Sequence, residues 1–321
     1  YESSNNVDCG GICGSTHLNL EILDQDGNIL ESLYSGDCFT PGTSGNVIFY
    51  PNTVSTSTIA PTLHLYTVDL QANSSATITG VGFSPVYGCT DTYAENYDPN
   101  ASSDDGSCSG YPDNGDYSLS FDRNSINVGE IGDYSSQVTV MGWVKTTDDQ
   151  SYHAIVSGNC GNIMLTMHGG KILFGSQCSS PIPHDTYGTT ELNNGEWYHV
   201  AATYDEYGGE NNLKVYVNGN LEGESTKSGQ FSGATGNFAI GSAPGGYEFI
   251  NGNLDMVRIW NTALTQDQIQ ENMLSDNALV DDGLLADWKV SSGEGNILYD
   301  HSGNGNHGSI EGASYSAEIP S

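Results

Sequence analysis

Residues 254–264 constrain the fold more than any other stretch, because a sheet pattern there runs directly into a helix pattern. Both alternating sets of side chains in residues 254–260 contain apolar residues, as in a strand that is covered on both faces. Thr265 then stands three residues before Gln268, which is the spacing of a helix capping box. Apolar residues recur at near-helical spacing from Leu264 to Met273. The segment predicts a core strand followed by one short amphipathic helix.

The composition favours strands and turns over helices. The chain has 321 residues, of which 41 are Gly and 19 are Tyr, while Lys and Arg together number only 7. Tyr is enriched in strands, and Gly in the turns that join them. The predicted fold class is all-β, and the length predicts more than one domain.

The charge excludes two classes of partner. Seven basic residues against 40 acidic residues give a net charge of −33, and this field repels nucleic acid and anionic membranes while it attracts divalent cations. We expect most of the acidic side chains to be solvated surface groups. Only clustered acids are therefore candidate metal ligands.

Residues 253–265 resemble the late-strand signature of the concanavalin A-like, laminin G-like and pentraxin-like jelly rolls, in which a short helix follows such a strand. Earlier segments resemble the strands of that family in the same order. The resemblance covers residues 111–321 and implies an antiparallel jelly roll of two sheets with one short helix. The earlier segments are residues 117–122, 138–144, 196–204, 213–219 and 238–242.

Residues 1–87 predict a small β-domain of their own, without resemblance to a known family. The dipeptide Asp26-Gly27 between the apolar stretches 18–23 and 29–33 indicates a β-hairpin. Further strands are predicted at residues 47–50, 63–68 and 76–81.

Residues 88–110 resemble a short Cys-bounded module, GCTD…DDGSC, of secreted bacterial surface proteins. Cys89 and Cys108 bracket a compact loop, as the cysteines of a structural disulfide do. Hard oxygen ligands crowd this loop, which suits calcium rather than zinc. The alternative is a solvated acidic linker closed by the disulfide. The candidate calcium ligands are Asp91, Asn96, Asp98, Asn100, Asp104 and Asp105.

A second disulfide is predicted from the register of a hairpin. Gly169-Gly170 predicts a two-residue turn that pairs residue 168 with 171 and, further out, residue 161 with 178. Cys160 then lies one residue from the position opposite Cys178, which is close enough for a bond. Seven cysteines are an odd number, and the sequence leaves the pairing of Cys9, Cys13 and Cys38 open.

The stretch at residues 300–308 resembles a loop of the laminin G-like pattern. Its three glycines permit a tight path, and Asp300, Asn304 and Asn306 offer side-chain oxygens to calcium. The alternative is a glycine-shaped turn packed against the first strand. We expect His301 and His307 to be polar surface groups.

The sequence predicts a protein that is not an enzyme. Glycan-cleaving members of the wider superfamily carry a strand with E-x-D-x-x-E, and this chain has no such run. It also lacks G-x-S-x-G, a phosphate loop and H-E-x-x-H. Glu196 and His199 are three apart on a predicted strand and so lie on opposite faces, and we expect His199 to be a core or edge residue rather than a base.

Two functions then compete. In the first, the chain is a structural subunit or adhesin that is stabilised by calcium and disulfides and associates with copies of itself or with other surface proteins. In the second, it is a calcium-dependent, lectin-like module that stacks a sugar on exposed rings, for which the candidates are Tyr204, Tyr207 and Tyr247. The cysteines favour a secreted, extracellular or cell-surface location in either case.

The hairpin register gives the first testable prediction. Peptide mapping under non-reducing conditions should recover Cys160 joined to Cys178, because the register places them at the open end of one hairpin. Recovery of both residues as free thiols would contradict the predicted register.

Overall fold

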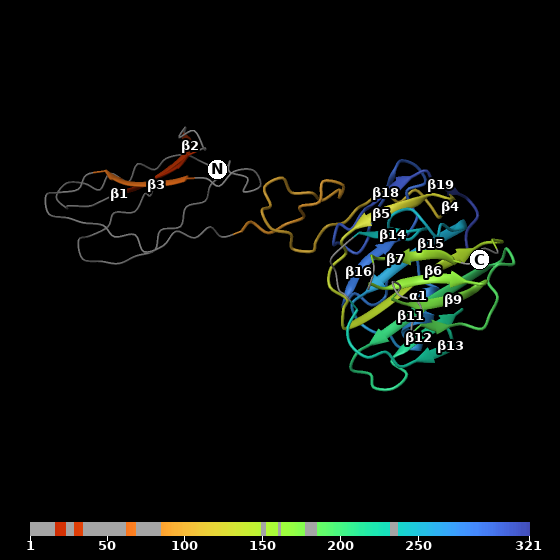
Figure 1. Ribbon diagram of the computed structural model, residues 1–321. Coiled ribbons are helices and arrows are strands. Elements are labelled where there is room, and N and C mark those ends of the chain that lie inside the picture. The colour runs from red at the N-terminus through yellow and green to blue at the C-terminus, as the bar shows by residue number, and fades with distance from the viewer. Residues whose placement is uncertain are drawn as a thin grey trace. The chain divides into compact units, whose positions relative to one another are not determined.

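The structure is a computed structural model, and it describes most of the C-terminal two-thirds of the chain. The described residues are 17–23, 29–34, 62–68, 85–148, 152–159, 162–176, 185–231 and 237–321. The chain divides into two compact units (Figure 1): Tyr1–Thr90 with Tyr97–Asp105, and Asp91–Asn96 with Gly106–Ser321.

The first unit contains a three-stranded antiparallel sheet in the order β2-β1-β3. The strands are β1 (His17–Leu23), β2 (Ile29–Tyr34) and β3 (Thr62–Val68). Pairing of β1 with β2 confirms the predicted hairpin, and β3 confirms the predicted strand at 63–68. The strands predicted at 47–50 and 76–81, like Cys9, Cys13 and Cys38, lie outside the described residues. The domain boundaries at residues 87 and 110 stay a prediction.

The second unit contains two antiparallel sheets, which confirms the predicted jelly roll. One sheet runs β13-β12-β11-β6-β15-β4-β19, with β16 paired to β15, and the other runs β10-β9-β8-β7-β14-β5-β18-β17. The first sheet comprises β4 (Ser118–Asp122), β6 (Gln137–Lys145), β11 (Trp197–Asp205), β12 (Leu213–Val217), β13 (Asn220–Ser225), β15 (Asn251–Trp260), β16 (Leu284–Trp288) and β19 (Ser314–Ser316). The second comprises β5 (Ser125–Gly129), β7 (Tyr152–Ser157), β8 (Met164–His168), β9 (Lys171–Gly175), β10 (Thr186–Tyr187), β14 (Phe238–Ile240), β17 (Ile297–Leu298) and β18 (Gly308–Glu311).

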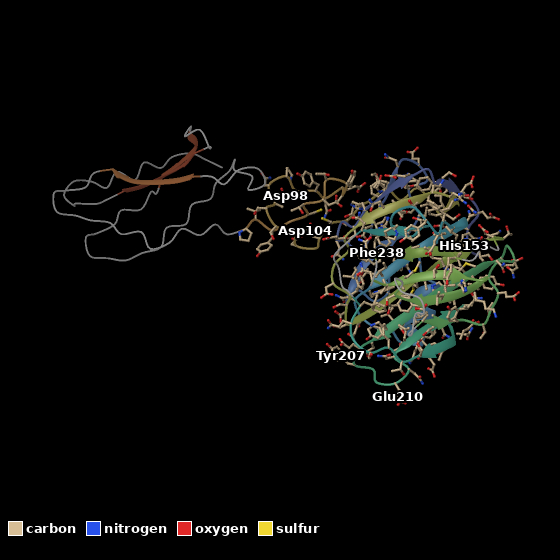
Figure 2. All side chains as sticks on the ribbon, in the orientation of Figure 1. Asp98, Asp104, His153, Tyr207, Glu210 and Phe238 are labelled. Atoms are coloured by element: carbon tan, nitrogen blue, oxygen red, sulfur yellow. The ribbon has the colours of Figure 1, made fainter. Side chains whose placement is uncertain are left out.

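The main core fills the space between these two sheets. Alternate residues of each strand point inward, because successive side chains of a strand face opposite sides. Leu119 and Phe121 of β4 are both buried, as the alternation predicts. Phe238 of β14 lies inside the unit in Figure 2 and is 1% exposed.

Strand β15 is covered on both faces, as the sequence predicts. Leu254 and Ile259 belong to the core between the sheets. On the outer face, Trp260 packs with Ile269 of helix α1 (Gln266–Met273) in a second apolar cluster. Thr265 and Gln268 form the predicted capping box at the start of the helix.

The predicted hairpin at Gly169-Gly170 is present, and a second two-residue turn lies at Asn218-Gly219. The turn at Gly169-Gly170 pairs His168 with Lys171, and the turn at Asn218-Gly219 pairs Val217 with Asn220. Cys160 and Cys178 lie outside the described residues. In the described part of the chain, no helix combines the length and the apolar character needed to cross a membrane.

Gly252 gives a stability prediction. Its φ is +152°, and a Cβ atom there would lie 2.2 Å from the backbone oxygen of Lys145. We expect Gly252→Ala to lower the free energy of unfolding by roughly 3 kcal/mol or more, because the cost of the rare backbone angle adds to the cost of the steric clash. Gly209→Ala is the matched control, since its φ is +75° and nothing lies within 4 Å of the added atom; we expect about 1 kcal/mol there. If urea unfolding showed the same loss of stability in Gly252→Ala and Gly209→Ala, the steric argument would be contradicted.

Candidate binding pocket beside strand β15

A bulge in the middle of β15 shapes the candidate site. Asp255 pairs with Trp143 and Arg258 with Met141, so Met256 and Val257 together oppose the single residue Gly142 of β6. Met256 has a φ of +47°, which non-glycine residues seldom adopt. A Cβ atom on Gly142 would lie 3.2 Å from a methyl group of Val257. Glycine at this position therefore leaves room for the bulge.

The bulge holds the carboxyl group of Asp255 in a buried position. Asp255 is 3% exposed, and its Oδ1 accepts a hydrogen bond from the Met256 N–H at 2.7 Å. Burial raises the pKa of Asp255 to about 7, and the charge of Asp116 adds to the rise, while backbone N–H groups and Arg258 oppose it. A buried carboxyl group that titrates near neutral pH marks a candidate site.

Asp255 lines a polar pocket of about 170 Å³. Four segments build its wall: the approach to β4, the bulge of β15, the residues that follow α1, and the residues that follow β16. Four carboxyl groups and one ammonium group line it, together with an amide and the hydroxyl-bearing side chains of a tyrosine and a serine. The lining residues are Asp113, Asp116, Tyr117, Asp255, Met256, Asp276, Asn277, Lys289, Val290 and Ser291.

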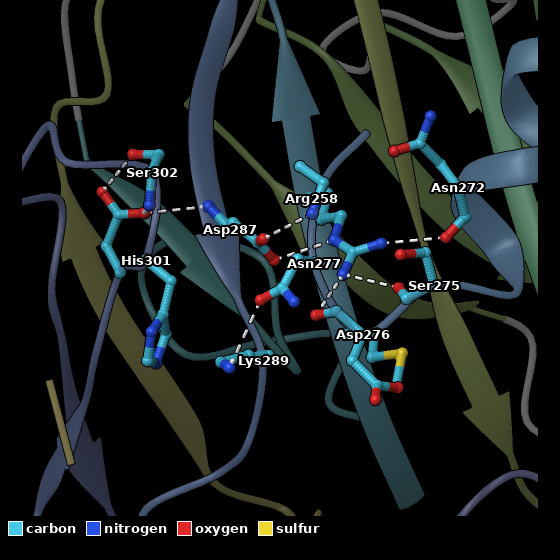
Figure 3. Close-up of polar contacts among 12 residues, drawn as sticks. Arg258, Asn272, Ser275, Asp276, Asn277, Asp287, Lys289, His301 and Ser302 are labelled. Carbon is cyan, nitrogen blue, oxygen red and sulfur yellow. Dashed lines mark hydrogen bonds and ion pairs between the residues drawn. The ribbon is translucent and has the colours of Figure 1, made fainter. Parts of the chain in front are cut away.

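A buried arginine fixes the wall after helix α1 (Figure 3). Arg258 is 1% exposed, and its Nε donates to Oδ1 of Asp287 at 2.8 Å. Its other nitrogens donate to the backbone oxygens of Asn272, Ser275 and Asp276 at 2.7 to 2.9 Å. Carbonyl groups at a helix C-terminus lack partners within the helix. Arg258 donates to one such carbonyl, that of Asn272, and to two carbonyls just beyond the helix, and so ties the wall to the sheet.

The opposite wall is held by backbone and side-chain hydrogen bonds. The N–H of Tyr117 donates to the oxygen of Val290 at 3.1 Å. Lys289 forms an ion pair with Asp113 at 2.8 Å, and its Nζ lies 3.5 Å from Oδ1 of Asn277. Lys289 therefore joins the two walls across the pocket.

The predicted tail ligands are engaged in their own loop. Asp300 is fully buried, and its carboxylate accepts four hydrogen bonds, from the N–H groups of Asp287, Ser302 and Asn306 and from the Ser302 hydroxyl, at 2.8 to 2.9 Å. The amide nitrogens of Asn304 and Asn306 donate to the backbone oxygen of Leu285. These three residues hold the loop together, and calcium at this loop stays a prediction.

The two histidines of the tail are not surface groups, so that expectation is wrong. The side chain of His307 is 10% exposed; its Nε2 lies 2.6 Å from Oδ2 of Asp91, and its Nδ1 accepts from the Asp300 N–H. Asp91 also accepts from the Tyr111 hydroxyl at 2.7 Å. Burial, with the charge of Lys289, lowers the pKa of His301 to about 4. Asp91 and Tyr93 pack against the ring of His307, while Tyr111 packs against the ring of His301.

The other predicted ligands of the acidic module serve local turns. Oδ1 of Asp98 accepts from the Asn100 N–H at 2.9 Å, and Oδ2 of Asp104 accepts from Thr90. Asn96 donates to the oxygen of Ser107 and accepts from Ser109. Cys89 and Cys108 are both disulfide-bonded. Calcium bound by Asp91, Asn96, Asp98, Asn100, Asp104 and Asp105 stays a prediction.

The tyrosine candidates for sugar stacking divide into two kinds. Tyr204 is fully buried, because β11 extends to Asp205, and its hydroxyl donates to Gly229 at 2.7 Å. Its proposed role as an exposed platform is wrong. Tyr207 and Tyr247 are 75% and 55% exposed, and Tyr207 lies on the outer loop after β11 in Figure 2. Their role in sugar binding stays a prediction.

His199 is buried, in agreement with its predicted place in the core. It is 2% exposed, its ring lies 5.4 Å from that of Trp143, and burial lowers its pKa to about 3. Sequence reasoning missed the pocket itself. The available signals were Gly142 inside an apolar strand and the acid Asp255 inside another, since both residue types are unusual in buried strands.

Asp255 gives a pH prediction. A raised folded-state pKa means that its contribution to the free energy of unfolding is complete below pH 4 and is lost as the pH rises to about 7. We expect Asp255→Asn to remove this loss and to be more stable than the parent protein at pH 8 in chelator, by up to roughly 4 kcal/mol. The difference should vanish near pH 4. Parallel stability curves for the two proteins in urea across this range would contradict the prediction.

Structural comparison finds several solved structures that are similar to this chain. A protein from Bacteroides ovatus that is described as carbohydrate binding matches with a TM-score of 0.53 and 17% identity, over 96% of this chain and 89% of that one. A heptameric SAP-like pentraxin from Limulus polyphemus matches with a TM-score of 0.46 and 19% identity, over 63% and 94%. Domains LG4-5 of the mouse laminin alpha1 chain match with a TM-score of 0.34 and 15% identity, over 47% and 43%.

The sequence comparison identifies the family. No curated protein matches the chain significantly in sequence. Residues 115–270 match the concanavalin A-like lectin/glucanases superfamily, and this match spans strands β4 to β15 and most of helix α1. The jelly-roll domain of this chain therefore belongs to the concanavalin A-like lectin/glucanase superfamily.

Proposed function

We propose that the C-terminal unit is a non-catalytic carbohydrate-binding domain that takes a sugar residue in the pocket beside β15. The observation that carries this proposal is the pocket itself, where hydrogen-bonding groups from four separate segments converge on one polar space. Sugar hydroxyl groups both donate and accept hydrogen bonds. The pocket offers carboxylates as acceptors, Lys289 as a donor, and Asn277 and Ser291 as both.

The size of the pocket supports a small ligand. Its volume of about 170 Å³ is below the roughly 300 to 1,000 Å³ of pockets for drug-sized ligands. Tyr117 and Met256 give it an apolar side for the C–H groups of a sugar ring. One sugar residue at the end or side of a glycan fits this combination better than a long chain.

Calcium is part of the proposal. Asp255, Asp276 and Asn277 offer the hard oxygen ligands that calcium prefers. A cation would also relieve the cost of ionising the buried Asp255 beside Asp116. Within the described residues, the carboxylates of the pocket do not form a group of three within 4.8 Å, so water and sugar hydroxyls would complete the coordination of the ion.

The comparisons support the same class of function. The domain belongs to a superfamily named for lectins and glucanases, and the protein from Bacteroides ovatus is described as carbohydrate binding. The chain lacks the E-x-D-x-x-E run of the glycan-cleaving members, which favours binding without cleavage.

The disulfide-bonded cysteines support an extracellular or cell-surface location. Self-association as a structural subunit or adhesin stays a prediction that rests on the N-terminal cysteines.

Calorimetry tests the proposal on the full chain with glycans selected from an array. We expect a glycan to bind in calcium and to lose its binding in chelator, and we expect Asp276→Asn to weaken binding roughly tenfold or more. The backbone oxygen of Asp276 stays available to Arg258 in this variant, so the fold is preserved.

Asp122→Asn makes the same chemical change at an exposed position outside the pocket and should leave the affinity unchanged. A glycan whose affinity is the same in Asp276→Asn and Asn277→Ala as in the parent protein would place sugar binding elsewhere. Equal affinity in calcium and in chelator would remove the ion from the proposal.

A further inference from the structure

We infer that the outer face of the second sheet carries a separate contact surface for an acidic glycan chain. The surface consists of Tyr152, His168, Lys171 and Tyr187, and we name it the outer stripe. It lies on the sheet that does not contain β15, so it is distinct from the pocket. The inference does not depend on the pocket proposal.

The strand register places all four side chains on one face. Tyr152 of β7 pairs with His168 of β8, and His168 pairs with Lys171 of β9. Tyr187 of β10 pairs with Leu173, two residues beyond Lys171. Paired residues, and residues two apart on one strand, share a face. The stripe therefore crosses neighbouring strands from β7 to β10.

This face points away from the core. The residues that alternate with the stripe, Met167 of β8 and Ile172 of β9, belong to the core between the sheets. Tyr187 is 45% exposed, while Tyr152, His168 and Lys171 are partly exposed. Solvent therefore reaches all four side chains of the stripe.

The rings lie close enough together to act as one platform. The ring centroids of Tyr152 and His168 are 4.2 Å apart with an angle of 31° between their planes. The rings of His168 and Tyr187 are 6.1 Å apart at 65°. Aromatic faces attract the C–H groups of a sugar ring, and successive rings can contact successive sugars of a chain.

Lys171 indicates which chemical class of glycan the outer stripe would bind. Most of the seven basic residues are already engaged: Lys145, Arg258 and Lys289 in ion pairs, and Lys227 and Arg123 over aromatic rings. Lys214 lies opposite Glu224 in the β12–β13 register. Among the described residues, no carboxylate forms an ion pair with Lys171.

An ammonium group without an ion pair, in a chain with 40 acidic residues, points to an acidic ligand. The net charge of −33 opposes such a ligand at long range. This repulsion is screened beyond about 8 Å at physiological ionic strength, so nearby charges decide the local interaction. Lys171 attracts an acidic ligand, whereas the charge of Asp185, which acts on Tyr187, opposes it at that end of the stripe. A carboxylate on a sugar that stacks on Tyr187 or His168 would meet this ammonium group. The fitting ligand is a chain of uronic acids.

Calorimetry with the full chain at physiological ionic strength tests the inference. The probes are a galacturonic acid oligomer, its methyl-esterified form and a neutral glucan oligomer of the same length. We expect the acidic oligomer to bind most tightly. Tyr187→Ala and Lys171→Ala should each weaken its binding roughly fivefold to tenfold, while Tyr187→Phe and Lys171→Arg should retain it.

Matched variants separate the stripe from general effects. Tyr97→Ala and Lys214→Ala remove an exposed ring and a cation elsewhere on the chain, and both should leave the affinity unchanged. Asp276→Asn should also leave it unchanged, so failure here and failure of the pocket proposal can be told apart. Thermal unfolding of each variant checks that the fold is intact. The inference would be overturned if the acidic oligomer did not bind, or if the esterified oligomer bound equally well. It would also be overturned if Lys214→Ala weakened binding as much as Lys171→Ala does.

Discussion

The buried ion pair between Arg258 and Asp287 connects most of the polar structure of this domain. One guanidinium group joins β15 to β16 and also supplies donors to the carbonyl groups that end helix α1. Removing one partner of such a pair leaves an unpaired buried charge, which costs about 3 to 5 kcal/mol. Asp287 continues the network, since its N–H donates to Asp300 and its backbone oxygen accepts from His301. The helix end, two strands and the tail loop are therefore one connected unit.

The pocket exists because this network and the bulge lie on the same strand. A regular β15 would continue its ladder past Gly142 and leave no recess, whereas the bulge with Met256 at positive φ turns the strand aside. Arg258 then holds residues 275–277 over the recess. A strained backbone conformation persists only where the surrounding structure holds it in place. Here Arg258, which is held by buried hydrogen bonds, lies two residues after Met256, which has the strained φ. The same strand thus creates the space and positions its wall.

Acidic residues far outnumber basic residues in this chain, and most of the basic side chains make ion pairs or lie over aromatic rings. Arg258, Lys289 and Lys145 each pair with a carboxylate, and Lys227 lies 4.6 Å above the ring of Phe231. Paired cations fix local geometry, as Lys289 does across the pocket. A cation without an ion pair is free to meet a ligand instead. The distinction between these two kinds of cation is visible only in the tertiary structure.

The sequence by itself determined the features that depend on near neighbours: the hairpin at Gly169-Gly170, the capping box at Thr265, and a strand covered on both faces at 254–260. Turn chemistry and side-chain periodicity act over a few residues, so spacing reveals them. Only the tertiary structure decided that Asp300 organises its own loop, that Tyr204 is buried, and that residues 113–117, 255–256, 276–277 and 289–291 share a pocket. Burial and contact between remote segments depend on how the two sheets pack, which no local pattern encodes.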